Sequence, residues 1–167
     1  MAEGPLQRQV NHVLEEEHRA TLDLLRRVEQ ACSGASRPGG LGEAEFARLA
    51  DAFAGHIERD IARHFDFEER ELFPRLEAAG EGDFTGLLLE EHVAIRQVAA
   101  EVLPKARAAA AGTLDAAGRE ALTRGALELV ERLFDHIGKE TTILLPLLED
   151  HLDTEADGEL ALRYAST

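Results

Sequence analysis

The sequence predicts an all-α fold, an up-down-up-down four-helix bundle, from three observations. Four long segments are rich in Ala, Leu, Glu and Arg, which favour helices. Apolar residues recur every three or four positions within these segments, so each helix has an apolar face. Short glycine-containing breaks separate the segments, and short links between long amphipathic helices favour antiparallel neighbours.

The four predicted helices span about residues 6–33, 43–79, 84–111 and 116–150, with ends uncertain by roughly 2–4 residues. The breaks between them are residues 33–42, 80–83 and 112–115, which are dominated by glycine and helix-capping residues. Pro74 and Pro146 are expected to kink their helices without ending them, because leucines continue on both sides. We therefore expect one domain over residues 1–167, a bundle over about 6–150 and a C-terminal extension over 151–167 that allows a short helix near 155–163.

Composition excludes several classes of partner. The chain of 167 residues has 18 basic and 33 acidic residues, and its formal net charge of −15 repels nucleic acid and anionic lipid. No segment approaches 18 uninterrupted apolar residues, and the first residues do not resemble an export signal. The single Cys32 cannot form an internal disulfide, as is common in a reducing compartment. We expect a cytoplasmic protein without nucleic-acid or membrane partners.

The chain contains two copies of one unit. At a constant offset of 72 positions, His64 and Glu68 match His136 and Glu140, and Leu72, Pro74, Leu76 and Glu77 match Leu144, Pro146, Leu148 and Glu149. At an offset of 74, Leu14, Glu16, Glu17, His18 and Val28 match Leu88, Glu90, Glu91, His92 and Val102. Each copy thus supplies one isolated histidine, followed by a histidine and a glutamate four residues apart.

The repeated histidines and glutamates are predicted to face the core at one depth. In the fourth helix His136 and Glu140 continue the apolar series of Leu129 and Leu133. Glu68 lies 12 residues before Gly80 and His92 lies 12 residues after it, so the helical rise places them in one layer. Six inward side chains follow from this reasoning: His18, His64, Glu68, His92, His136 and Glu140.

These six side chains form a typical ligand set for a metal pair. Residues i and i+4 share one helix face, so each His–Glu pair can approach one centre. Buried Glu68 and Glu140 need a positive partner, and neither face offers Lys or Arg at an adjacent inward position. Two divalent ions would supply it, with each carboxylate bridging both ions and the imidazoles completing the ends. Nitrogen and carboxylate donors without thiolate suit iron, manganese or zinc.

Two alternatives remain open at this point. An isolated histidine on an apolar face is usually a satisfied core residue, and both His–Glu pairs would face solvent if their helices were rotated. The remaining histidines, His12, His56 and His151, are not expected to be ligands, although His56 lies near the flank of the site. The pairs Glu16–Glu17 and Glu90–Glu91 are expected to be solvated, or else one member of each hydrogen-bonds an imidazole.

The order of motifs resembles the hemerythrin-like family, in its cation-binding (HHE) type. That family has His, His-x-x-x-Glu, His and His-x-x-x-Glu in this order, which here correspond to His18, His64 with Glu68, His92, and His136 with Glu140. The resemblance runs from about residue 10 to 150 and includes Glu-Leu-Phe-Pro at 71–74. It implies a four-helix bundle around two non-heme iron ions with an oxo or hydroxo bridge. Zinc and manganese are the other metals that suit the donors.

Two departures from the oxygen-carrying members argue against reversible oxygen transport. Those members have a histidine where this chain has Arg96, and an aspartate five residues after the last His, where this chain has Glu140 at four. Three functions follow as hypotheses. The first is a di-iron protein that senses, binds or handles O2, NO or peroxide, or holds labile iron. The second is a di-iron enzyme that turns over peroxide or NO or repairs iron centres, and the third is a structural bundle with zinc or no metal. The sequence identifies no redox or protein partner.

Overall fold

The computed structural model describes residues 7–34 and 40–166, and within these ranges the regular structure is entirely helical. The first rod of the bundle is α1 (Gln9–Cys32) and the third is α5 (Gly82–Ala110). The second rod runs continuously through α2 (Glu43–Gly55), η1 (His56–Ile61), α3 (Ala62–Phe67), η2 (Glu68–Leu72) and α4 (Phe73–Ala78). The fourth is α6 (Ala116–Lys139), η3 (Glu140–Leu144) and α7 (Leu145–His151), and α8 (Thr154–Ala165) follows it.

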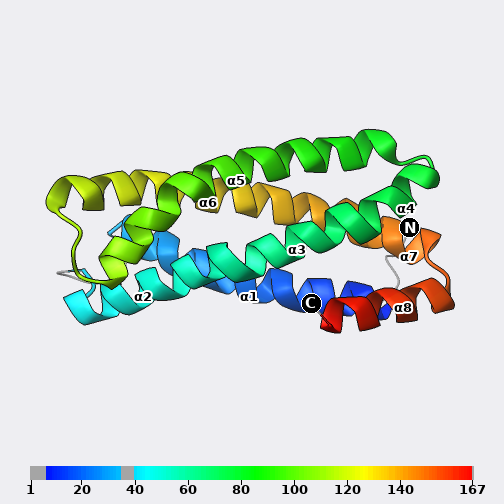
Figure 1. Cartoon of the computed structure of the whole chain (residues 1–167), viewed down its shortest axis with the longest axis horizontal. Helices are drawn as coiled ribbons and strands as arrows, with labels where there is room; N and C mark the ends of the chain where they lie inside the picture. The colour runs from blue at the N-terminus through cyan, green and yellow to red at the C-terminus, as the bar shows by residue number, and fades with distance from the viewer. Residues whose placement is uncertain (1–6, 35–39, 167) are drawn as a thin grey trace.

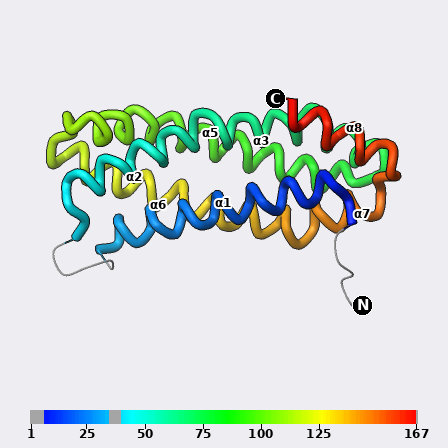
Figure 2. Tube along the Cα trace, turned by 90° about the horizontal axis from the view of Figure 1, so that it is seen from below, coloured from blue at the N-terminus to red at the C-terminus, as the bar shows by residue number. Residues whose placement is uncertain are grey.

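The rods run up, down, up and down, as predicted (Figure 1). From below, α1 lies alongside α6, so the first and last rods close the bundle (Figure 2). The predicted fifth helix is present as α8. Gly34, Gly80 and Gly112 follow the ends of three rods with φ of 67°, 100° and 71°, the left-handed conformation that commonly ends helices. Residues 1–6 and 35–39, which the first predicted helix and the first break include in part, lie outside the described residues.

The core consists of two separate apolar clusters along the bundle. One contains Leu25, Phe53, Ile95 and Leu129 among its buried members. The other contains Leu14, Phe73, Leu88, Leu144 and Leu148. In α1, the buried His18 lies in sequence between Leu14 of one cluster and Leu25 of the other. The level of the bundle at which His18 lies is therefore between the two apolar clusters.

A π-helical turn precedes each of the two prolines that were predicted to kink their helices without ending them. η2 begins at Glu68 and η3 begins at Glu140, so the same deformation occurs at equivalent points of both repeats. Pro74 and Pro146 follow these turns, and proline cannot donate the helical hydrogen bond to the carbonyl four residues earlier. A π turn accommodates such a lost bond without ending the rod, and π turns often occur at functional sites.

The C-terminal helix α8 packs against α1 (Figure 1). The buried carboxylate of Asp157 accepts hydrogen bonds from the backbone N–H groups of Gln9 and Val10, at 2.9 and 3.0 Å. These donors have no partner within the first turn of α1, and a carboxylate there also complements the helix dipole. The ring of Tyr164 packs 4.5 Å from that of Phe67, centroid to centroid, which brings α8 against the second rod as well. None of the described helices is long and apolar enough to cross a membrane.

Candidate metal centre

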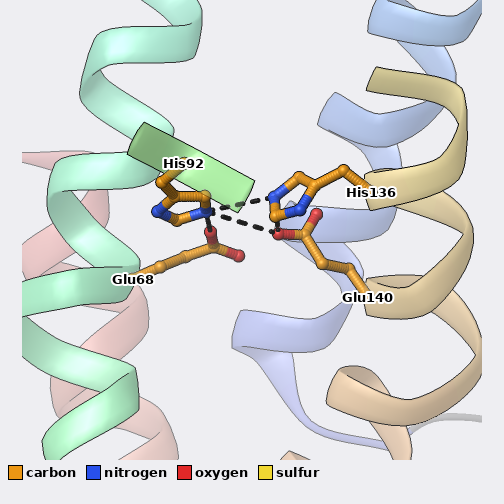
Figure 3. Close-up of side chains that lie close together, drawn as sticks. All are labelled: Glu68, His92, His136 and Glu140. Atoms are coloured by element: carbon orange, nitrogen blue, oxygen red, sulfur yellow. Dashed lines mark hydrogen bonds and ion pairs between the residues drawn. The ribbon is translucent and has the colours of Figure 1, made fainter. Parts of the chain in front are cut away.

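The structure brings the six predicted side chains together. His18 extends from α1, His64 from α3, His92 from α5 and His136 from α6, while Glu68 and Glu140 open the π turns η2 and η3. All six are buried, and Glu68, His92 and Glu140 have no exposed surface. Figure 3 shows four of them pointing toward one another from three rods. We call the six residues the His–Glu cluster.

Each carboxylate of the cluster directs one oxygen toward each half of it. In Glu140, Oε1 lies 2.7 Å from Nε2 of His136, and Oε2 lies 3.0 Å from Nε2 of His18 and 3.7 Å from that of His64. In Glu68, Oε1 lies 3.3 Å from Nε2 of His64, and Oε2 lies 3.3 Å from Nε2 of His92. The cluster therefore consists of two histidine pairs, His18 with His64 and His92 with His136, joined by two carboxylates.

The outward nitrogens of three imidazoles contact carboxylates. Nδ1 of His64 lies 2.9 Å from Glu17, Nδ1 of His136 lies 2.8 Å from Glu91, and Nδ1 of His92 lies 2.7 Å from Glu69. An ionised carboxylate only accepts hydrogen bonds, so each of these Nδ1 atoms carries a hydrogen. Outer carboxylates of this kind fix the ring orientation of metal-binding histidines and increase their basicity.

The outer contacts follow the internal repeat, with one exception. Glu17 and Glu91 are equivalent residues, and they contact the equivalent His64 and His136. The counterpart of Glu69 is Thr141, whose hydroxyl lies 3.3 Å from Nδ1 of His18. The pair His92 and His136 is thus held by two carboxylates, and the pair His18 and His64 by one carboxylate and one hydroxyl.

Three of the four imidazoles offer the interior of the cluster no hydrogen-bond donor when they are neutral. Because Nδ1 carries the hydrogen on His64, His92 and His136, their Nε2 atoms are then acceptors and face the oxygens of Glu68 and Glu140. All four carboxylate oxygens and Nε2 of His18 are buried without a hydrogen-bond partner. Nε2 of His92 lies 3.0 Å from Nε2 of His136, so a hydrogen fits on only one of these two atoms. Converging nitrogen and oxygen acceptors fit metal cations, and groups of these atoms lie within 4.8 Å of one another.

Without a metal ion, protons compensate the buried carboxylates. Burial opposes the charged form of His92, but hydrogen bonds with Glu140 and Glu68 outweigh it and raise the pKa of His92 to about 9. The pKa values of His64 and His136 are raised against burial by the same carboxylates. Burial alone would raise the pKa of Glu140, but hydrogen bonds with the four histidines hold it well below its ordinary value. Metal ions and protons therefore compete for the same acceptor atoms.

A cavity of about 200 Å³ adjoins the cluster. Its wall includes the exposed Ala20 and Asp60 and the buried His18 and His64, so it leads from the surface to this histidine pair. His136 of the other pair also lines the cavity, whereas His92 does not. Phe65 stacks on His92 with ring centroids 3.7 Å apart and an angle of 9°, and Phe73 lies 5.5 Å from the same imidazole. Of the four histidines of the cluster, His92 is the one that lies away from this cavity.

The remaining histidines lie outside the cluster, as expected. His12 is exposed, and the nearest charged partner of His151 is Glu81 at 3.5 Å. His56 lines the cavity rather than the cluster. Arg96 donates hydrogen bonds to Glu69 and Asp66, so its charge supports an outer carboxylate. Of the two acidic pairs, one member of each, Glu17 and Glu91, contacts an imidazole, which is the second of the two expectations for them.

Three residues that contact a histidine of the cluster, or a carboxylate beside it, were not predicted. Glu69 directly follows Glu68 and contacts His92, and Thr141 directly follows Glu140 and contacts His18. Their adjacency to the cluster glutamates is the sequence signal that could have identified them. Tyr164 of α8 donates a hydrogen bond to Glu17 and lies outside both repeats. No pattern in the sequence marks Tyr164 for this role.

Comparison with known proteins identifies one family. The model of the hemerythrin HHE cation binding domain matches residues 9–148, which includes every residue of the His–Glu cluster and excludes α8. No curated protein matches the chain.

Proposed function

The chain belongs to the hemerythrin HHE cation-binding domain family, and we propose that it binds two iron ions and through them senses, binds or handles O2, NO or peroxide. In this proposal His18 and His64 hold one ion and His92 and His136 hold the other. Glu68 and Glu140 would help to hold both ions, because each has one oxygen beside each pair. The bound pair would supply redox chemistry and coordination positions that the side chains leave open.

One observation carries the proposal. Each of Glu68 and Glu140 has one oxygen beside each histidine pair, and the inward nitrogens of His64, His92 and His136 are acceptors when the imidazoles are neutral. Buried acceptors without donors are rare in folded proteins. A bridged pair of cations satisfies both carboxylates, whereas a single ion at either pair would leave the far oxygens without a partner.

The residues around the cluster support the binding of a small molecule. Glu17, Glu69 and Glu91 orient three imidazoles, and Leu133 and Ile137 contribute apolar surface to the cavity beside His18 and His64. The volume of about 200 Å³ admits diatomic molecules and peroxide. The donor atoms also suit zinc and manganese, and the family resemblance favours iron.

The cavity also accommodates a second candidate, a di-iron enzyme that turns over peroxide or NO. A binding protein needs access for one ligand, whereas an enzyme must also release its product. The opening toward exposed Ala20 and Asp60 serves both purposes. Holding iron in a labile form remains within the first proposal. We further propose a cytoplasmic location, which the single free Cys32 favours.

Metal analysis and optical spectroscopy test the proposal. Protein produced in iron-sufficient medium should contain about two irons per chain, as two histidine pairs require. Aerobic and anaerobic samples should differ in near-ultraviolet absorption. His136→Ala should reduce the iron content, and His151→Ala, which changes a histidine outside the cluster, should not. A folded protein that takes up no iron on reconstitution would support the structural alternative, and steady turnover of peroxide or NO that is lost in His136→Ala would support the enzyme.

A further inference from the structure

The imidazole of His56 contacts one exposed residue and one buried residue of the cavity wall. His56 opens η1 and lies eight residues before His64. Its Nδ1 lies 2.9 Å from Oδ2 of Asp60, and its Nε2 lies 3.0 Å from Oγ1 of Thr21 on α1. Asp60 is exposed and Thr21 is buried, and both line the cavity together with His18. A residue outside the predicted ligand set therefore contacts the space that a small ligand would enter.

The contacts of His56 determine which groups donate. The carboxylate of Asp60 accepts, so Nδ1 of His56 carries a hydrogen. In the neutral imidazole Nε2 is an acceptor, and the hydroxyl of Thr21 donates to it. When a second proton is added, Nε2 donates to Oγ1 of Thr21 instead. The hydrogen of the Thr21 hydroxyl is then free to rotate toward the cavity, so a proton on His56 creates a hydrogen-bond donor inside.

Apart from the histidines of the cluster, the side chains that line the cavity offer an anion little positive charge. Among its charged residues, Glu17, Asp60 and Glu140 are acidic, and the guanidinium of Arg63 already donates to Glu17 and lies over the ring of Tyr164. An anion that enters therefore meets carboxylates, unless positive charge is added. The titratable groups that face the cavity, besides His56 itself, are Glu17, His18, Asp60, Arg63, His64, His136 and Glu140.

We propose that small anions of the azide and hydroperoxide class bind in this cavity together with one proton, which His56 takes up and Thr21 presents to the anion. This inference rests on the proposed function, because the bound metal pair attracts the anion. The proton comes from solvent, on the side of the exposed Asp60, and no covalent bond other than the N–H bond forms. His56 is a positioning residue here, since it acts through the hydroxyl of Thr21.

Azide binding to the iron-loaded full chain tests the inference. The absorption of the azide complex gives the affinity, and calorimetry in two buffers with different heats of ionisation gives the number of protons taken up. At pH 7.5 the His56→Gln variant, whose amide cannot gain a proton, should take up about one proton fewer than the unchanged protein. Between pH 6 and 8, the azide affinity of this variant should also vary less with pH than that of the unchanged protein. The difference should reach about tenfold per pH unit.

Two further variants make the test specific. Thr21→Val retains His56 but removes the hydroxyl, so it should lose the same proton uptake. His151→Gln, which makes the same exchange outside the cavity, should leave proton uptake unchanged. Equal proton uptake in His56→Gln, Thr21→Val and the unchanged protein would overturn the role assigned to His56. The proposed small-ligand function would not be affected by that result. Iron-loaded protein that binds neither azide nor NO would instead overturn the proposed small-ligand function, and the present inference with it.

Discussion

The hydroxyl of Tyr164 donates a hydrogen bond to the carboxylate of Glu17, and the same carboxylate lies 2.9 Å from Nδ1 of His64. A helix outside the matched family region is thus connected to the His–Glu cluster through one carboxylate. The guanidinium of Arg63 also contacts Glu17, and these donors lower its pKa against the opposing effect of burial. α8 therefore helps to keep Glu17 ionised and in place.

Tyr164→Phe should weaken metal binding by about tenfold, because partners of metal-bound histidines typically contribute 10- to 100-fold in affinity. The loss should concern one of the two ions, since His64 is the cluster histidine that Glu17 contacts. Competition with a coloured chelator measures it. Leu162→Ala is the matched control, because Leu162 lies on the same helix and is 72% exposed. Unchanged affinity in Tyr164→Phe would mean that Arg63 and His64 are sufficient to hold Glu17.

Glu140→Ala should lower metal content more than His56→Ala. Glu140 lies beside all four imidazoles of the cluster, whereas His56 contacts Asp60 and Thr21. Removing the carboxylate of Glu140 leaves Glu68 as the remaining carboxylate between the two histidine pairs. Metal analysis after identical reconstitution gives the comparison. If both variants lost the same amount, the bridging role of Glu140 would be wrong.

The metal-free protein should lose stability as the pH rises from about 6.5 to about 9. His92 has its pKa raised from 6.5 to about 9 in the folded chain, so the protonated imidazole stabilises the fold. That contribution is complete below the unfolded pKa and disappears as pH passes the folded value. Thermal unfolding of the chelator-treated protein at pH 6, 7.5 and 9 should show a falling Tm. Iron-loaded protein should show a smaller decrease, because metal replaces the protons.

Metal should dissociate as pH falls through about 6 to 4, because histidine must be neutral to bind it. The raised pKa values of His64, His92 and His136 increase the competition from protons. Each bound ion should consequently release protons, which an indicator dye detects. Dialysis at stepped pH followed by metal analysis measures retention. Full retention at pH 4 would show that protons do not reach the site.

Thr141→Glu should strengthen binding of the ion that His18 and His64 are proposed to hold. Position 141 is the counterpart of Glu69, and a carboxylate there would face Nδ1 of His18 as Glu69 faces that of His92. The gain should reach about tenfold, by the same effect of outer carboxylates. Stepwise titration with zinc separates the two binding events. Thr142→Glu adds the same charge one position away and is the control, so an equal gain in both variants would indicate only a general effect of charge.

The sequence was sufficient for the rods and for the six clustered residues. The repeat retained His18, His64 and Glu68 with the same identities as their counterparts, and helical spacing directed them inward. Glu69 was not predicted because its counterpart in the other repeat is Thr141. The reasoning considered only positions at which both repeats have the same residue. The choice between Glu16 and Glu17 depended on the neighbouring rod, which spacing within one helix does not describe.

Longer-range contacts were beyond the sequence for a different reason. Tyr164 reaches Glu17 only because α8 folds back along α1, and the cap formed by Asp157 fixes that return. A side-chain contact between residues so far apart leaves no local pattern. The π turns at Glu68 and Glu140 were indicated in part, since a proline follows each glutamate by six residues, but proline kinks take several forms.

The separation of the core into two apolar clusters has a consequence for how the centre is filled. Each end of the bundle buries its own leucines and aromatic rings, so neither end relies on ions for its packing. Emptying the middle should therefore leave the rods assembled. We therefore expect that a metal ion can enter the assembled bundle after synthesis, be withdrawn by a chelator and be restored, without a cycle of unfolding.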